Sequence, residues 1–107
     1  MNDGRIALLK KYIEEEPENP FNAYALAMEY YDTEPASALR LLQDLLSTHP
    51  GYLPSYYKVA HLLWEEEKWD QAEGAFIKGI QLAKEYSDSK ALSELESAYQ
   101  NFQFDKD

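Results

Sequence analysis

The sequence predicts an all-α protein, built as an antiparallel array of helix-turn-helix repeats with about six helices. Apolar residues recur at spacings of three and four along most of the chain, which is the period of an α-helix. Prolines and glycines interrupt these stretches in short clusters, of which Pro50, Gly51 and Pro54 form the clearest. No stretch shows sustained alternation of apolar and polar residues, so we expect no β-sheet.

The intervals between these breaks predict helices joined by short links. Their expected ranges are about 3–16, 21–31, 35–48, 53–67, 69–86 and 88–102. Asn19 followed by Pro20 is a typical helix start, because asparagine caps the first turn and proline fits its first position. Asp3 is expected to cap the first helix, and Ser87 or Asp88 the last.

Two of the helix pairs resemble each other in sequence. Ala27 and Ala60 are the matching alanines of the two first helices, and they lie 33 residues apart. Ala38 and Ala72 are the matching alanines of the two second helices, and they lie 34 residues apart. One residue is therefore missing from the turn inside the first pair.

Two glycines lie inside the fifth predicted helix, where each costs about 1 kcal/mol relative to alanine. Gly79 falls at a position where the helices of a pair must approach closely, so we expect tight packing to compensate for it. The sequence gives no physical reason for Gly74.

These residues resemble the tetratricopeptide repeat family, whose 34-residue motif reads aromatic-x2-Leu-Gly-x2-Tyr, then Ala-x3-Phe, then Pro. In the first pair, Pro50 matches the proline that ends a repeat. The chain departs from the motif by Ala27 and Ala60 at the glycine position and by Lys84 at the second closing proline. The second pair carries the motif at Tyr56, Val59, Ala60, Leu63, Ala72 and Phe76.

The resemblance implies a single domain over residues 1–107. Its repeats would span 21–50 and 51–84, with an N-terminal covering helix at 1–17 and a C-terminal capping helix at 88–103. Two repeats bury too little surface on their own, which is why helices at both ends are expected to cover them.

In this family the first helix of each pair lines a concave groove. Carried onto this chain, that position holds an aromatic stripe, which the resemblance implies as the surface for a protein or peptide partner. Members that bind acidic peptides use groove lysines, asparagines and arginines, and here only Lys58 stands at such a place, so an apolar or weakly basic segment fits better. The candidate partner-binding residues are Phe21, Tyr24, Met28, Tyr31, Tyr57, Lys58, His61, Trp64 and Glu65.

The aromatic stripe has three possible uses at this stage. The rings can pack on one another as internal structure, they can form a partner groove in an adaptor or scaffold, or they can join copies of the chain. The third possibility, a homo-oligomer, extends to the aromatic end of the last helix at Tyr99, Phe102 and Phe104.

Composition excludes several other functions. The formal net charge of -10 repels phosphate backbones, so we expect no nucleic-acid partner. The chain has no cysteine and no apolar run of membrane-spanning length, so we expect a cytoplasmic protein. His61 and Glu65 share a helix face but have no further metal-ligand motif beside them. We therefore expect no cofactor, no metal and no enzymatic activity.

Overall fold

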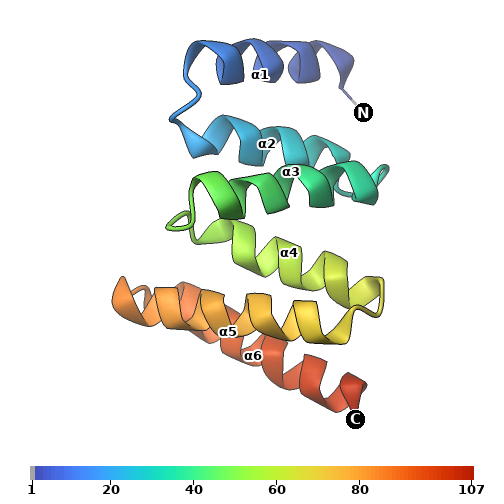
Figure 1. Ribbon diagram of the computed structural model, residues 1–107, viewed down its shortest axis with the longest axis vertical. Coiled ribbons are helices and arrows are strands. Elements are labelled where there is room, and N and C mark those ends of the chain that lie inside the picture. Colours follow the sequence, from blue (N-terminus) through green and yellow to red (C-terminus); the bar gives the residue numbers. More distant parts are fainter. Residues whose placement is uncertain (1) are drawn as a thin grey trace. The chain divides into compact units, whose positions relative to one another are not determined.

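The computed structural model describes residues 2–107, and in this range the chain forms six α-helices and no strand (Figure 1). The predicted all-α class is therefore confirmed. The helices are α1 (Asp3–Glu15), α2 (Pro20–Tyr30), α3 (Pro35–Thr48), α4 (Pro54–Glu65), α5 (Trp69–Glu85) and α6 (Ser89–Lys106). Within 2–107, no helix is both long and apolar enough to cross a membrane.

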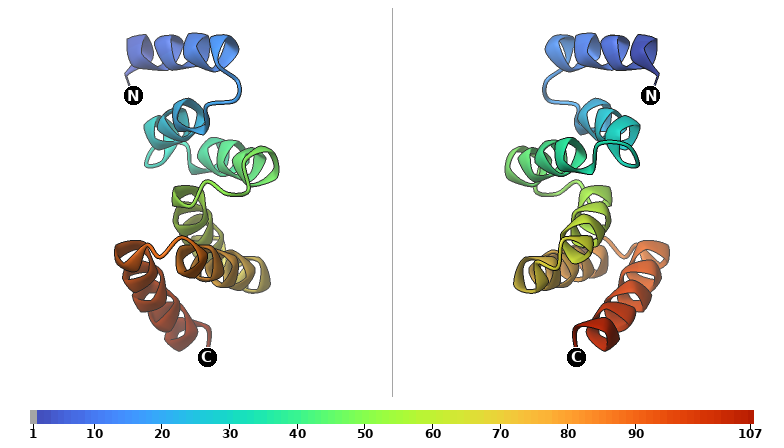
Figure 2. Two further views of the ribbon diagram at one scale, coloured as in Figure 1. Left: turned by 90° about the vertical axis from the view of Figure 1, so that its left-hand side faces the viewer. Right: turned by 90° about the vertical axis from the view of Figure 1, so that its right-hand side faces the viewer.

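The chain divides into two compact units, Met1–Ser55 and Tyr56–Asp107, and each is described by itself. The first contains α1, α2 and α3, and the second contains most of α4 together with α5 and α6. Figure 2 shows the antiparallel pairs α2–α3 and α5–α6 from two further sides.

Side-chain caps begin α2 and α6 as predicted, and the cap of α1 differs from the prediction. The side chain of Asn19 accepts a hydrogen bond from the Phe21 amide at 3.1 Å, and that of Asp88 accepts one from the Ala91 amide at 3.1 Å. Asp3 is not a cap, because Asn2 stands one position earlier in extended conformation and accepts from the Arg5 amide at 2.9 Å. Asp3 is instead the first helical residue, where a negative charge favours the helix dipole.

The last helix is longer than the sequence indicated. It continues past Phe102 to Lys106, since no proline or glycine follows Phe102 to end it. This extension carries Asp105 and Lys106 into the structured part of the second unit, where both make contacts with earlier helices.

The core of the first unit lies where α1 packs on α2. Ile6 and Leu9 of α1 are buried against Ala25 and Leu26 of α2, with Ile13, Tyr30 and Leu41 packed partly buried around them. Two polar contacts tie the same unit together. Arg5 Nε lies 2.6 Å from Glu29 Oε1, and His49 Nε2 donates to the Glu18 carbonyl oxygen at 3.0 Å.

The core of the second unit depends on small residues at close helix contacts. Ala60 and Ala72 are fully buried, and so are the rings of Phe76 and Phe102. A Cβ built on Gly79 would lie only 2.9 Å from Cβ of Tyr56 and 3.3 Å from Cδ2 of Leu95. The predicted tight packing at Gly79 is therefore confirmed.

The residue missing from the first pair corresponds to a difference in turn geometry. After α4, Glu67 adopts a positive φ of 57°, and the Lys68 amide donates back to the Leu63 carbonyl at 2.9 Å. After α2 there is no left-handed residue, and the Glu34 amide bonds to the Tyr30 carbonyl at 2.7 Å. The first pair thus makes its turn without the left-handed step that the second pair uses.

Candidate functional site

The predicted partner residues of the first unit lie on α2 beside a pocket of 330 Å³. Phe21 is 57% exposed, whereas Tyr24 and Met28 are half-buried in the pocket wall. Arg5 and Glu29 complete this wall on one side. Tyr31, the residue that ends α2, is half-buried and does not line the pocket.

Tyr24 is held in place by a second ring. It meets Tyr52 edge to face, with ring centroids 5.6 Å apart. Burial raises the pKa of Tyr24, with a further contribution from Tyr52, so its hydroxyl stays protonated and able to donate at neutral pH. The face of α2 therefore combines one open ring, Phe21, with one fixed ring that carries a hydroxyl.

The predicted residues of the second unit form a column of rings along α4. Tyr57 and His61 have centroids 4.5 Å apart, and His61 stacks on Trp64 at 5.5 Å. Trp64 also meets Phe76 of α5 at 6.2 Å and Phe102 of α6 at 5.5 Å. The inner side of this column is therefore internal packing, which was one of the three possible uses.

The outer side of the column opens into a pocket of 540 Å³. Two of its residues come from helices other than α4: Trp69 begins α5, and Asp105 lies near the end of α6. The indole Nε1–H of Trp64 donates a hydrogen bond of 2.6 Å to Asp105 Oδ2. The pocket is lined by His61, Trp64, Glu65, Glu67, Trp69 and Asp105.

Sequence reasoning missed three of these residues. Glu67 lies in a turn, Trp69 was placed only as a helix start, and Asp105 fell beyond the expected end of the last helix. The aromatic side chain of Trp69 was the one available signal, because tryptophan is highly buried on average.

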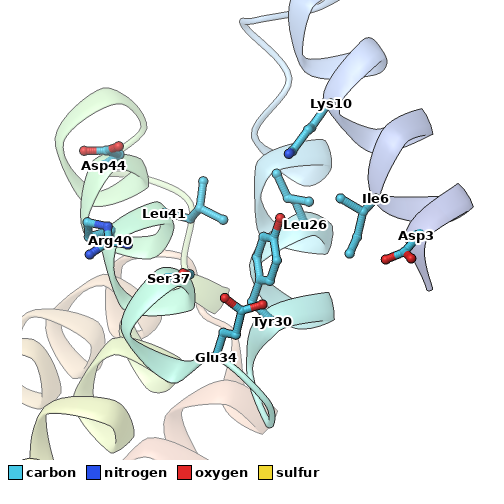
Figure 3. A pocket seen from close by; sticks show the side chains of 10 residues that line it. All are labelled: Asp3, Ile6, Lys10, Leu26, Tyr30, Glu34, Ser37, Arg40, Leu41 and Asp44. Atoms are coloured by element: carbon cyan, nitrogen blue, oxygen red, sulfur yellow. The ribbon is translucent and has the colours of Figure 1, made fainter. Parts of the chain in front are cut away.

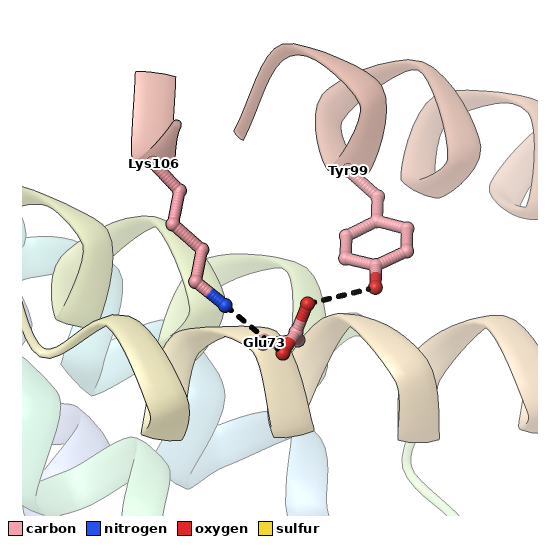
Figure 4. Close-up of polar contacts among 3 residues, drawn as sticks. All are labelled: Glu73, Tyr99 and Lys106. Carbon is pink, nitrogen blue, oxygen red and sulfur yellow. Dashed lines mark hydrogen bonds and ion pairs between the residues drawn. The ribbon is translucent and has the colours of Figure 1, made fainter. Parts of the chain in front are cut away.

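A partly buried carboxylate, that of Glu73, holds the last helix against α5. Glu73 accepts a hydrogen bond from the Tyr99 hydroxyl at 3.0 Å and forms an ion pair with Lys106, whose Nζ lies 3.3 Å from Glu73 Oε1 (Figure 4). Burial raises the pKa of Tyr99, and the hydrogen bond to Glu73 raises it further. This contact fixes the end of α6, and with it the position of Asp105.

Two solved structures resemble this chain over most of its length. The solution NMR structure of a tetratricopeptide repeat domain protein from Salinibacter ruber has a TM-score of 0.73 and 38% identity, and the match covers 80% of this chain and 88% of that one. A crystal structure of a tetratricopeptide repeat domain protein from the same organism has a TM-score of 0.76 and 34% identity, covering 79% and 97%. This chain belongs to the tetratricopeptide repeat family.

No family model matches the sequence, and no curated protein matches it either. Membership in the tetratricopeptide repeat family supports a protein–protein interaction module in general terms. The chemistry that a partner must have depends on the residues at the two faces.

His61, in the column of rings along α4, is uncharged near neutral pH. Burial lowers the pKa of His61, nearby Lys58 lowers it further, and Glu65 opposes both. Its Nε2 atom is buried and has no hydrogen-bond partner in the described chain. Within residues 2–107, no three histidine or acidic side chains gather in a way that could hold a metal ion.

A further pocket of 570 Å³ lies among α1, α2 and α3 (Figure 3). Its apolar part is formed by Ile6, Leu26 and Leu41, and the hydroxyl-bearing ring of Tyr30 crosses it. Its charged residues have both signs, so they select no ligand by charge. They are Asp3, Lys10, Glu34, Arg40 and Asp44.

Proposed function

We propose that this tetratricopeptide repeat protein is a non-enzymatic adaptor that binds a segment of a partner protein on the faces of α2 and α4. The observation that carries the proposal is that aromatic side chains adjoin a pocket on each face, with Phe21 exposed on α2 and the rings of α4 partly exposed. The residues proposed to contact the partner are Phe21, Tyr24, Met28, Tyr31, Tyr57, Lys58, His61, Trp64 and Glu65.

The chemistry of both faces supports an apolar or weakly basic segment. On α2, Phe21 and Met28 offer apolar surface, and a flexible thioether adapts to irregular side chains. On α4, the rings stand beside carboxylates, and the whole chain carries a formal net charge of -10. A basic partner would therefore associate faster at low ionic strength, because salt screens the attraction between opposite charges.

Replacing Tyr24 and Tyr57 together by alanine is expected to abolish capture of the partner. Aromatic side chains at such faces commonly carry most of the binding energy, so the double variant should lose at least about tenfold in affinity. The measurement is affinity capture from the source organism, followed by mass spectrometry and by titration of the purified partner.

Tyr12→Ala serves as the matched control, since Tyr12 is an exposed tyrosine of α1 that belongs to neither face. It should capture the same partner as the unmodified chain. Circular dichroism has to show equal helicity in all three proteins. Retention of the partner by the double variant would contradict the proposal.

Self-association is a second candidate function, favoured by one observation. Phe104, near the end of α6, is 78% exposed, the most of any large apolar side chain within residues 2–107. Phe102 is fully buried, so of the two phenylalanines at this end only Phe104 can join two copies. If copies associate here, light scattering over a concentration series should show a dimer that Phe104→Ser returns to a monomer. A monomer at every concentration would remove this function.

A further inference from the structure

The pocket beside Trp64 has aromatic walls and acidic edges. Its volume is 540 Å³, and its lining contains two tryptophans, three carboxylates and one histidine but no lysine or arginine. The nearest lysines along these helices have other partners in the described chain: Lys68 pairs with Glu66 at 3.3 Å, and Lys106 with Glu73 at 3.3 Å. In the described part of the chain, neither of these two lysines is paired with a carboxylate of the pocket.

The walls of this pocket are fixed before any ligand arrives. The ring of Phe102 is fully buried and lies 5.5 Å from that of Trp64 and 5.8 Å from that of Trp69, between centroids. Asp105 is held at the edge because its Oδ2 accepts the Trp64 indole proton at 2.6 Å. Binding a ligand here would cost little ordering of side chains, which favours affinity.

We propose that this pocket receives an arginine side chain of the partner protein. The inference rests on the proposed adaptor function and specifies the chemistry of one contact. A guanidinium group is planar, so it can stack on an indole face while its N–H groups reach carboxylates at the edge. Asp105 uses Oδ2 for the Trp64 hydrogen bond, so the guanidinium would meet its Oδ1, and Glu65 and Glu67 add negative charge.

His61 is compatible with a cationic ligand. Its lowered pKa, caused chiefly by burial, leaves the ring uncharged near neutral pH, so it does not repel a guanidinium. Its buried Nε2 has no partner within the described chain. The charge of Lys58 lowers the pKa of His61, but Lys58 does not line the pocket.

The test uses the full chain and the peptide acetyl-Gly-Gly-Arg-Gly-Gly-amide. Trp64 and Trp69 are the only tryptophans of the sequence, so indole fluorescence and the indole N–H signals in NMR report on this pocket alone. We expect saturable, millimolar binding that shifts both indole signals and weakens as salt is raised. The same peptide with citrulline, which is uncharged but has nearly the same shape, should produce no saturable shift.

Asp105→Asn is the decisive variant, because asparagine keeps an oxygen that can accept the Trp64 indole proton while removing the charge. It should weaken binding of the arginine peptide about threefold to tenfold. Glu96→Gln, the same change of charge at an exposed position of α6, should leave the affinity unchanged. Equal binding of the citrulline peptide, or equal affinity of Asp105→Asn and Glu96→Gln, would overturn the arginine assignment.

This result is distinct from that of the adaptor test. If the Tyr24 and Tyr57 variant loses its partner while the arginine peptide fails to bind, the adaptor function stands and the arginine contact is wrong. If the peptide binds as expected while the double variant keeps its partner, the pocket binds arginine and the proposed role of the two tyrosines is wrong.

Discussion

Replacing Phe102 by alanine is expected to destabilise the protein by about 3–5 kcal/mol, the usual cost of deleting a buried phenylalanine. The ring is fully buried and contacts four other rings, with centroids 5.3 Å from Phe76 and 6.1 Å from Tyr99 in addition to the two tryptophans. Because small domains have only about 5–15 kcal/mol of total stability, this loss is large. Urea unfolding followed by circular dichroism measures it.

The matched control lies two positions further along the same helix. Phe104 is 78% exposed, so Phe104→Ala should change the free energy of unfolding by less than about 0.5 kcal/mol. A similar loss of stability in both variants would mean that α6 does not bury Phe102 as described.

The readout must separate local from global unfolding, because α6 is the last helix of its unit. In repeat proteins an end element can detach while its neighbours keep their helices. Trp64 and Trp69 both contact Phe102, so their emission should shift to longer wavelength in Phe102→Ala even where much of the helicity remains. The arginine peptide should lose its binding in the same variant, since the walls of its pocket are then no longer fixed.

Alanine at the two glycines of α5 is expected to have opposite effects. At Gly79 the new Cβ would lie 2.9 Å from Cβ of Tyr56, which cannot rotate away because it is the first atom of its side chain. Overpacking of this kind costs about 1–3 kcal/mol and outweighs the gain in helix propensity of about 1 kcal/mol. The new Cβ would also lie 3.3 Å from Cδ2 of Leu95, so we expect a cost near the upper end of this range and a net loss of stability of about 1–2 kcal/mol for Gly79→Ala.

Gly74→Ala is the internal control for this prediction. No atom lies within 4 Å of the position that its Cβ would take, so nothing in the structure requires glycine there. The substitution should raise the stability by about 1 kcal/mol, through propensity and a less flexible unfolded chain. Thermal unfolding of the two variants should therefore shift the midpoint in opposite directions. A shift of Gly79→Ala upward would show that α4 and α5 are not in close contact.

Local sequence signals were sufficient to predict the helices and most of their starts. Helical spacing of apolar residues, the Asn19–Pro20 start and the Asp88 cap depend on neighbours within a few positions, so they can be read without tertiary structure. The close approach at Gly79 was also predictable, because the repeat aligns it with small residues that must lie between helices. The Asp3 cap and the early end of the last helix were wrong, since helix ends are decided by single competing hydrogen bonds.

The periodicity of the sequence by itself determined the array of paired helices with the tetratricopeptide motif. What only the tertiary structure decided is which side of each aromatic ring remains open. Trp64 and Asp105 are 41 positions apart, and their hydrogen bond exists because α6 packs across the end of the α4 ring column. Periodicity places a residue on a helix face, but the contact between faces depends on helices distant in sequence, and this contact forms the acidic aromatic pocket.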